Sequence, residues 1–348
     1  TILLEYLAAA GRDNGIRTFF AHVLPTNRRM LGVFRQVGFD VATRFADGVI
    51  EVRFEIEPTE ASQSALEERE RRAEARTVAR LLEPRVVAVV GAGRRPGTIG
   101  HEVVRQLVRH GFSGAVYAVN PEALHVAGVR AWPSVLDVPD RVDLAVVAVP
   151  AGEVLDAVAA CGQAHVGALV VVSTGVDDAL VALARRHGIR VLGPASLGLV
   201  NTDPDVRLHA TFADLDVVPG NVALSLQSGS LGVGIVERAT AAGIGLSSVV
   251  AVGDKADVSG NDLLAWWEDD GRTDVVLLSL ESFGNPRRFR RVAPRVTRRK
   301  PVVALVRDAA TVDDLLAQTG VIRADGVASM LDVAAVLATQ PVPGGRRV

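Results

Sequence analysis

Short apolar runs alternate with amphipathic stretches along the chain from residue 86 onward. Continuous apolar runs separated by helices are typical of parallel strands that are covered on both faces of the sheet. A Pro219-Gly220 break divides the runs into two sets. We expect strands at 86–90, 115–119, 144–149, 168–172 and 191–192, and then at 222–226, 248–252, 275–280 and 302–305. The pattern predicts an α/β protein with two doubly wound parallel-sheet domains in series.

The first 57 residues follow a different pattern. Apolar residues at helical spacing predict a helix that ends at Gly15, then a strand over 18–24 and a second helix that stops at Gly38. Alternation over 49–55 suggests an edge strand. A piece of this size needs a partner to complete its core. From 58 to 84 Glu, Arg and Ala dominate and form i,i+4 charge pairs, so we expect a solvated connecting helix.

Composition narrows the function classes. The chain has 348 residues, 49% of them apolar and 22% charged, with a net charge of −2, which suits a soluble protein with a full core and argues against nucleic acid as a partner. The single cysteine, Cys161, excludes an internal disulfide framework and a zinc cluster. No apolar run reaches the ~18 residues of a membrane span, and no signal peptide is visible. We therefore expect a cytoplasmic protein with no metal and no membrane partner.

A glycine-rich segment, Gly91–Gly100, lies between the first predicted strand and a helix. Glycines let backbone N–H groups approach a phosphate, and a helix N-terminus favours negative charge. The spacing is GxGxxxG, and the second strand ends in Asn120-Pro121 where a dinucleotide fold wants an acid for the ribose. The segment therefore favours a phosphate-bearing cofactor other than NAD. Two alternative interpretations remain, namely the NAD(P) site of an oxidoreductase and a tight turn that binds no ligand.

Several motifs carry a family resemblance. Gly91–Gly100, Val119-Asn120-Pro121, Ala148–Ala151 and Gly193–Gly198 resemble the Rossmann-like CoA-binding domain of NDP-forming acyl-CoA synthetases and succinyl-CoA synthetase alpha chains. Gln227–Ser230, Gly253–Asp257 and Glu281–Pro286 resemble the flavodoxin-like ligase domain of these enzymes.

The resemblance implies CoA or acyl-CoA, such as acetyl-CoA, as the ligand. The residues it assigns to this ligand are Gly91, Ala92, Gly93, Arg94, Gly97, Thr98, Ile99, Asn120, Pro121, Val149, Pro150, Ser173, Thr174 and Gly175. A possible anion site comprises Gln227, Ser228, Gly229 and Ser230. Two departures could weaken CoA binding, namely Glu122 where a base is common and Ala195 where relatives often have Asn.

The same resemblance bears on catalysis. These synthetases pass phosphate through a histidine that follows the strand matched by 302–305, but no histidine occurs here after His209. Glu281, which the family uses to orient the phosphohistidine, is thus expected to lack its partner. We predict no catalytic residue in this chain and no ligase turnover by the chain alone.

The segment Asn27–Phe39 is similar to the Asn-to-Gly-Phe motif of GNAT acetyltransferases. The GNAT acetyl-CoA loop would precede Thr1, and Phe34 stands where many relatives have a tyrosine acid, so acetyl transfer by this chain alone is not expected. Fusions of GNAT and synthetase-like modules are known as protein lysine acetyltransferases. The resemblance implies a CoA-binding regulatory region, with protein lysines as substrates of a complete GNAT domain.

The alternatives are a subunit or fragment of an active ADP-forming acetate/acyl-CoA ligase and an NAD(P)-binding oxidoreductase. A homo-oligomer or pairing with an ATP-grasp domain is expected. The predicted boundaries are a partial GNAT domain over 1–57, a helical linker over 58–84, a CoA-binding domain over 85–205, a flavodoxin-like domain over 206–340 and the start of a truncated domain over 341–348.

Overall fold

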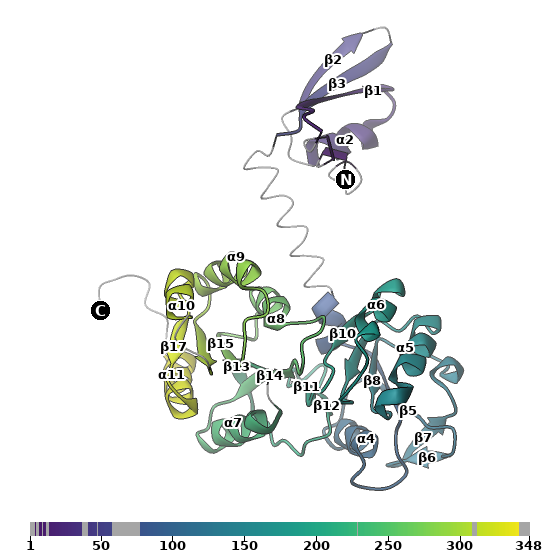
Figure 1. Cartoon of the computed structure of the whole chain (residues 1–348), viewed down its shortest axis with the longest axis vertical. Coiled ribbons are helices and arrows are strands. Elements are labelled where there is room, and N and C mark those ends of the chain that lie inside the picture. Colours follow the sequence, from purple (N-terminus) through teal and green to yellow (C-terminus); the bar gives the residue numbers. More distant parts are fainter. Residues whose placement is uncertain are drawn as a thin grey trace. The chain divides into compact units, whose positions relative to one another are not determined.

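The computed structural model describes residues 4, 7–8, 10–11, 14–36, 41–46, 48–57, 77–227, 229–307 and 312–340 (Figure 1). The chain divides into two compact units, Thr1–Glu74 and Ala75–Val348. Most of the predicted charged helix (58–76) and the predicted start of a further domain (341–348) lie outside the described residues.

The smaller unit contains a three-stranded antiparallel sheet in the order β1-β3-β2. Its elements are β1 (Thr18–Val23), α2 (Arg28–Gln36), β2 (Val41–Ala46) and β3 (Val49–Glu55). The strand over 49–55 was predicted at an edge but is central, because β2 pairs with its second side through a turn at Gly48 (φ +80°). Phe34, 3% exposed, packs against Phe54 at a ring-centroid distance of 5.2 Å. Phe34 is therefore a core residue of this unit.

The first sheet of the larger unit has the order β10-β9-β8-β4-β5-β7-β6. All neighbouring strands are parallel except the β6–β7 hairpin. The strands are β4 (Val86–Val90), β5 (Ala115–Val119), β6 (His125–Val126), β7 (Val129–Trp132), β8 (Leu144–Val147), β9 (Ala168–Val171) and β10 (Arg190–Leu192). The six parallel strands have the Rossmann order 3-2-1-4-5-6, which confirms the predicted fold class.

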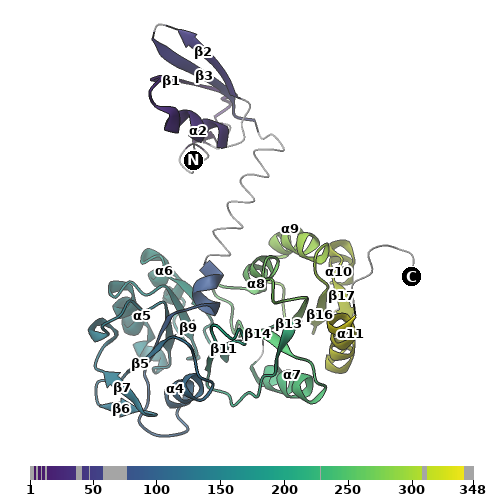
Figure 2. The ribbon, with the colours of Figure 1, turned by 180° about the vertical axis from the view of Figure 1, so that it is seen from behind.

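Helices cover both faces of this sheet, as Figure 2 shows from behind. The elements are α4 (Ile99–Arg109), the 3-10 turns η1 (Val135–Asp137) and η2 (Ala151–Glu153), α5 (Val154–Gln163) and α6 (Ala179–Arg186). Apolar side chains of α4 pack with Val87 and Val89 on one face. Those of α5 and α6 pack with Ala88 and Val90 on the other. Because helices cover β4, β8 and β9 on both faces, these strands are continuous apolar runs.

The second sheet has the order β12-β11-β14-β13-β15-β16-β17. Its strands are β11 (Gly198–Asn201), β12 (Leu208–Thr211), β13 (Pro219–Leu226), β14 (Leu246–Ala251), β15 (Val275–Leu280), β16 (Val302–Val306) and β17 (Ile322–Ala324). Strands β13 to β17 are parallel in the flavodoxin order 2-1-3-4-5. Strand β11 lies within the predicted 85–205 domain, but it pairs antiparallel with β14. The boundary between the two sheets therefore falls after β10 and not at 205.

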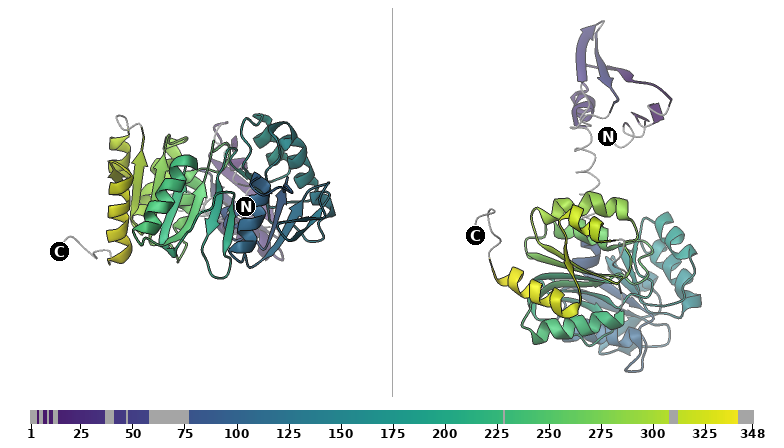
Figure 3. Two further views of the ribbon diagram at one scale, coloured as in Figure 1. Left: turned by 90° about the horizontal axis from the view of Figure 1, so that it is seen from below. Right: turned by 60° about the vertical axis from the view of Figure 1, so that its left-hand side comes forward.

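The helices of the second domain are α7 (Gly229–Ala241), α8 (Gly260–Trp267), α9 (Pro286–Thr297), α10 (Asp313–Thr319) and α11 (Val327–Thr339). Helices α7 and α11 pack on one face of the sheet (Figure 3). Helices α8, α9 and α10 pack on the other face, in the same apolar cluster as α4. The two domains thus share one core.

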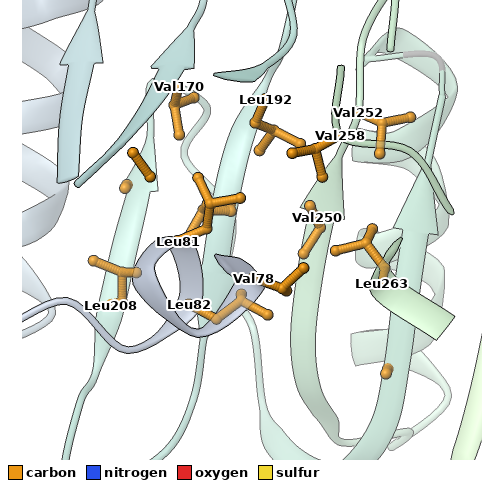
Figure 4. Close-up of a cluster of buried hydrophobic side chains, with 14 of the residues drawn as sticks. Val78, Leu81, Leu82, Val170, Leu192, Leu208, Val250, Val252, Val258 and Leu263 are labelled. Atoms are coloured by element: carbon orange, nitrogen blue, oxygen red, sulfur yellow. The ribbon is translucent and has the colours of Figure 1, made fainter. Parts of the chain in front are cut away.

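A short helix over 77–82 lies inside that shared core (Figure 4). Val78, Leu81 and Leu82 are 1% exposed or less and come close to Val170 of the first sheet and Val250 of the second. The prediction of a solvated helix over 58–84 is therefore wrong at its end. The i, i+3, i+4 spacing of the three apolar residues is the signal that was missed.

Candidate functional site

Each sheet has one pair of adjacent parallel strands whose following connections cross to opposite faces of the sheet. This arrangement opens a crevice at the carboxyl ends of the two strands. In the first sheet these strands are β4 and β8. A cavity of about 340 Å³ lies at this switch point. Five of the predicted ligand residues line it, namely Gly91, Asn120, Pro121, Val149 and Pro150. Glu122, Ser134 and Glu153 also line it but were not among the predicted residues.

Glycines shape the loop beside this cavity. A Cβ at Gly91, whose φ is +85°, would lie 2.8 Å from the carbonyl carbon and oxygen of Ala148. A Cβ at Gly93 would lie only 2.3 Å from Oγ1 of Thr98, and one at Gly100 would meet the Gly91 carbonyl oxygen. The loop is therefore folded so tightly that side chains at these positions would displace it. Such a cradle of bare backbone suits a phosphate group.

The helix that follows the loop leaves its first turn available. Thr98 is the N-cap residue of α4, but its hydroxyl donates to the Arg95 carbonyl oxygen (2.8 Å) and caps no first-turn amide within the described residues 97–102. The Gly97 N–H donates to Oε1 of Glu102 (2.9 Å). This bond and the Arg105 guanidinium lower the pKa of Glu102. Ile99 is 42% exposed at the start of the helix. The N-terminus of α4 can thus receive an anion.

Several predicted ligand residues support the loop. The Asn120 side chain donates from Nδ2 to the Ala92 carbonyl oxygen (2.7 Å) and accepts the Glu122 N–H at Oδ1 (2.8 Å). Ser173 Oγ donates to the carbonyl oxygen of Val149 (2.6 Å). Ser173, Thr174 and Gly175 do not line the described cavity. Asn120 and Ser173 thus hold the walls of the site in place.

Two carboxylates give the cavity a negative side. Glu122 and Glu153 line it from the turn after β5 and from η2. Oε2 of Glu122 lies 3.5 Å from Nη2 of Arg94, the predicted ligand residue in the glycine loop. Both side chains are largely exposed, at 77% and 63%. Arg94 is therefore paired with an acid that lines the cavity.

The second sheet has its switch point between β13 and β15. There the Gln227 side-chain oxygen accepts the N–H groups of Glu281 (2.8 Å) and Ser282 (3.1 Å). The Lys255 ammonium donates to the same oxygen (3.3 Å) and to Ser282 Oγ (2.6 Å), and its burial lowers the pKa of Lys255. Only about 20 Å³ of cavity is left. The groups that could bind an anion are thus largely satisfied by the chain itself.

The remaining predicted anion residues and Glu281 complete this region. Gly229 begins α7, Ser228 lies outside the described residues, and nothing is described of the Ser230 side chain. Glu281 pairs with an arginine, while no histidine follows His209 in the sequence. Its Oε1 lies 3.2 Å from Nη2 of Arg307, which follows β16. The sequence pattern missed this pair because the two residues come from neighbouring strands.

The last histidine of the chain, His209, lies in β12 and is stacked on His110 at the end of α4, with ring centroids 3.6 Å apart. Among the described residues, His209 Nδ1 and His110 Nε2 have no hydrogen-bond partner. Burial, the His110 ring and the Arg109 guanidinium lower the pKa of His209 to about 3. The His209 ring is therefore a neutral group at the contact between the two domains.

No group of three or more metal-ligating side chains occurs in the part of the chain that the structure describes. The thiol of Cys161 is fully buried, and burial raises its pKa to about 12. None of the described helices combines the length and apolar character needed to span a bilayer.

The family comparisons agree with this geometry. Residues 85–202 match the model of a CoA binding domain, and residues 219–307 match that of a succinyl-CoA ligase like flavodoxin domain. The first range contains the cavity and its glycine loop, and the second contains the closed switch point. These two segments of the chain therefore match a CoA binding domain and a succinyl-CoA ligase like flavodoxin domain. The predicted ligand class, CoA or acyl-CoA, is confirmed.

The particular relatives are ADP-forming ligases. The chain is 36% identical over 301 residues to the alpha subunit of ADP-forming acetate–CoA ligase I from Pyrococcus furiosus, covering 77% of this chain and 65% of that protein. It is 39% identical over 236 residues to ADP-forming acetate–CoA ligase I from Archaeoglobus fulgidus, covering 65% and 34%. The chain thus spans between about one third and two thirds of these relatives.

A solved structure supports the same relationship. The dinucleotide forming acetyl-coenzyme A synthetase 1 of Ca. Korarchaeum cryptofilum, in complex with phosphate and ADP, superposes with a TM-score of 0.74 at 36% identity, covering 77% of this chain and 64% of that one. Neither matching family model includes residues 1–84. These comparisons do not support the GNAT resemblance, and it stays a prediction.

Proposed function

We propose that this chain is the CoA-binding, alpha-subunit-like region of an ADP-forming acyl-CoA ligase. The open cavity at the β4/β8 switch point carries this proposal, because it combines a glycine cradle, an uncapped helix N-terminus and five of the predicted ligand residues. The similarity to ADP-forming ligases supports it over the regulatory acetyltransferase reading.

The chain's own residues have defined tasks in this proposal. The glycine loop and the first turn of α4 hold the phosphates of the ligand through backbone N–H groups. Asn120 fixes the loop, and Ser173 fixes Val149 in the opposite wall. CoA, when bound, supplies the thiol that accepts an acyl group. The apolar wall formed by Val149 and Pro150 lines the route that its pantetheine arm takes.

Ligase turnover requires more than this region. The given sequence has no histidine after His209, so phosphate transfer through a histidine in this region needs a residue from outside residues 210–348. We propose an ATP-grasp domain as the partner that brings the nucleotide chemistry. Incubation of the chain with labelled ATP, with and without such a partner, separates the two readings. Acid-labile phosphate on the chain alone would contradict our assignment.

CoA binding is tested by isothermal titration of the full chain. Gly93→Val places side-chain atoms where Oγ1 of Thr98 lies, so the loop has to open. We expect CoA binding to weaken at least about tenfold, or 1.4 kcal/mol. Gly152→Ala is the matched control, since a Cβ there meets nothing within 4 Å and Gly152 precedes the cavity residue Glu153. Absence of saturable CoA binding by the unmodified chain would overturn the proposed function.

The acetyltransferase reading of residues 1–57 rests on the segment Asn27–Phe39 alone. Its coupling to CoA binding, its protein lysine substrates and a homo-oligomer stay predictions. An acetylation assay with the full chain and labelled acetyl-CoA tests the expectation that this chain alone transfers no acetyl group.

A further inference from the structure

Glu122 lies after the second strand of the Rossmann fold, in the region where such folds contact the ribose of their nucleotide. In this fold an acid after the second strand accepts hydrogen bonds from free ribose hydroxyls, whereas a nearby Arg accommodates a phosphate on the ribose. The second strand here is β5, which ends at Val119. Asn120 and Pro121 carry no acid, but the structure places Glu122 in the cavity wall. An acid is thus present at the ribose end, two residues later than the sequence pattern indicates.

Contacts on both its main chain and its side chain hold Glu122. Its N–H donates to Oδ1 of Asn120 (2.8 Å), and Nδ2 of Asn120 donates to the Ala92 carbonyl oxygen of the glycine loop (2.7 Å). Its carboxylate pairs with Arg94 of the same loop at 3.5 Å. Glu122 is therefore linked to the glycine loop by its main chain through Asn120 and by its carboxylate through Arg94.

The charge of the cavity favours a particular form of ligand. The described residues that line it include the acids Glu122 and Glu153 but no Lys or Arg. Arg94, the neighbouring loop cation, is already paired with Glu122. A phosphate monoester carries between one and two negative charges at neutral pH. At the ribose end it would meet a carboxylate and would have to separate the Arg94–Glu122 pair.

We propose that Glu122 is a specificity-determining residue that discriminates against a phosphate on the ribose of the bound nucleotide. It accepts a hydrogen bond from a free ribose hydroxyl and keeps Arg94 from a ribose phosphate. CoA carries a 3′-phosphate on this ribose, and dephospho-CoA carries a hydroxyl there. The inference rests on the proposed function, since it requires that the first cavity binds the nucleotide end of such a ligand.

The test is isothermal titration of the full chain with CoA and with dephospho-CoA, for the unmodified chain, Glu122→Gln and Glu153→Gln. We expect the unmodified chain to bind dephospho-CoA at least as tightly as CoA. Glu122→Gln should lower the ratio of the CoA Kd to the dephospho-CoA Kd by about fivefold, the effect of one exposed charge pair. Glu153→Gln, a matched acid in the same cavity without the Arg94 contact, should change this ratio less than about twofold.

The outcomes separate this inference from the proposed function. An unchanged ratio in Glu122→Gln, or an equal change in Glu153→Gln, overturns the role of Glu122 while CoA binding stands. Binding of CoA more than about tenfold tighter than dephospho-CoA by the unmodified chain also overturns it. If the unmodified chain binds neither ligand, both the proposed function and the inference fail.

Discussion

The two switch points of the larger unit obey the same topological rule but differ in what fills them. Between β4 and β8 the chain leaves a cavity of about 340 Å³. Between β13 and β15 it leaves about 20 Å³. Glycine backbone borders the first crevice, whereas the side chains of Gln227 and Lys255 occupy the second. Sheet topology creates the crevice, and the side chains at the strand ends decide whether a ligand can enter it.

The hydrogen bonds of the two crevices explain this difference. At the first, the Asn120 side chain bonds to the loop from the side and leaves the first turn of α4 without a side-chain cap. At the second, Gln227 uses its own oxygen to satisfy two backbone N–H groups. Arg307 pairs with Glu281 beside it. The helix N-terminus at the first crevice therefore has no side-chain cap, whereas the polar groups at the second crevice bond mostly to one another.

The largest effect is expected from the core that both sites share. Leu82 is fully buried and belongs to the cluster that includes strands of both sheets. Leu82→Ala should lower the free energy of unfolding by about 3 kcal/mol, because it removes buried methyl groups and leaves a cavity. Urea unfolding followed by circular dichroism should show a single, shifted transition for the larger unit. Leu124→Ala, at a residue 82% exposed, is the control and should cost less than about 0.5 kcal/mol.

Two separate transitions within the larger unit in Leu82→Ala would contradict a shared core. They would indicate that the two sheets, and hence the two switch points, unfold independently.

The next effect concerns pH at the contact of α4 with β12. The pKa of His209 falls from about 6.5 in the unfolded chain to about 3 in the folded chain, through burial, His110 and Arg109. The contribution of neutral His209 to the free energy of unfolding is therefore fully present above pH 6.5. As the pH falls below 6.5, the unfolded chain binds a proton that the folded chain does not, which costs about 1.4 kcal/mol per pH unit. Between pH 7 and 5 this amounts to about 2 kcal/mol.

His209→Phe keeps a ring against His110 and removes the titrating group. Urea unfolding at pH 7, 6 and 5 should show a shallower loss of stability in this variant than in the unmodified chain. Equal slopes would show that His209 does not titrate in this range and that other groups govern the acid response.

The smallest effect is expected at the closed switch point. Gln227→Ala removes the acceptor of two backbone N–H groups and of Lys255. Because water can reach these groups, the free energy of unfolding should fall by only about 1 kcal/mol. CoA affinity, measured by titration, should stay unchanged. Weaker CoA binding in this variant would show that the second switch point takes part in binding, against the contrast drawn between the two sites.

Prediction from the sequence succeeded where local pattern and backbone geometry decide the structure. The apolar runs located the parallel strands of both sheets except β7 and β17, and Gly91–Gly100 located the loop at the first switch point. Prediction failed for β11 and β12, which are short and lie antiparallel at one edge of the second sheet. Their hydrogen bonds to a distant strand, and not their own periodicity, make them strands.

The sequence by itself determined the fold class and the place of the glycine cradle, because apolar periodicity and missing Cβ atoms act within a few residues. The tertiary structure alone decided which side chains complete each site. It brought Glu122 to Arg94 at the open crevice and Gln227 to Glu281 at the closed one. Glu122 and Arg94 are 28 positions apart in the sequence, and Gln227 and Glu281 are 54 positions apart. These contacts therefore depend on strand order and not on local sequence. Strand order is a property of the packed molecule, and the side chains that it brought together left one crevice open and filled the other.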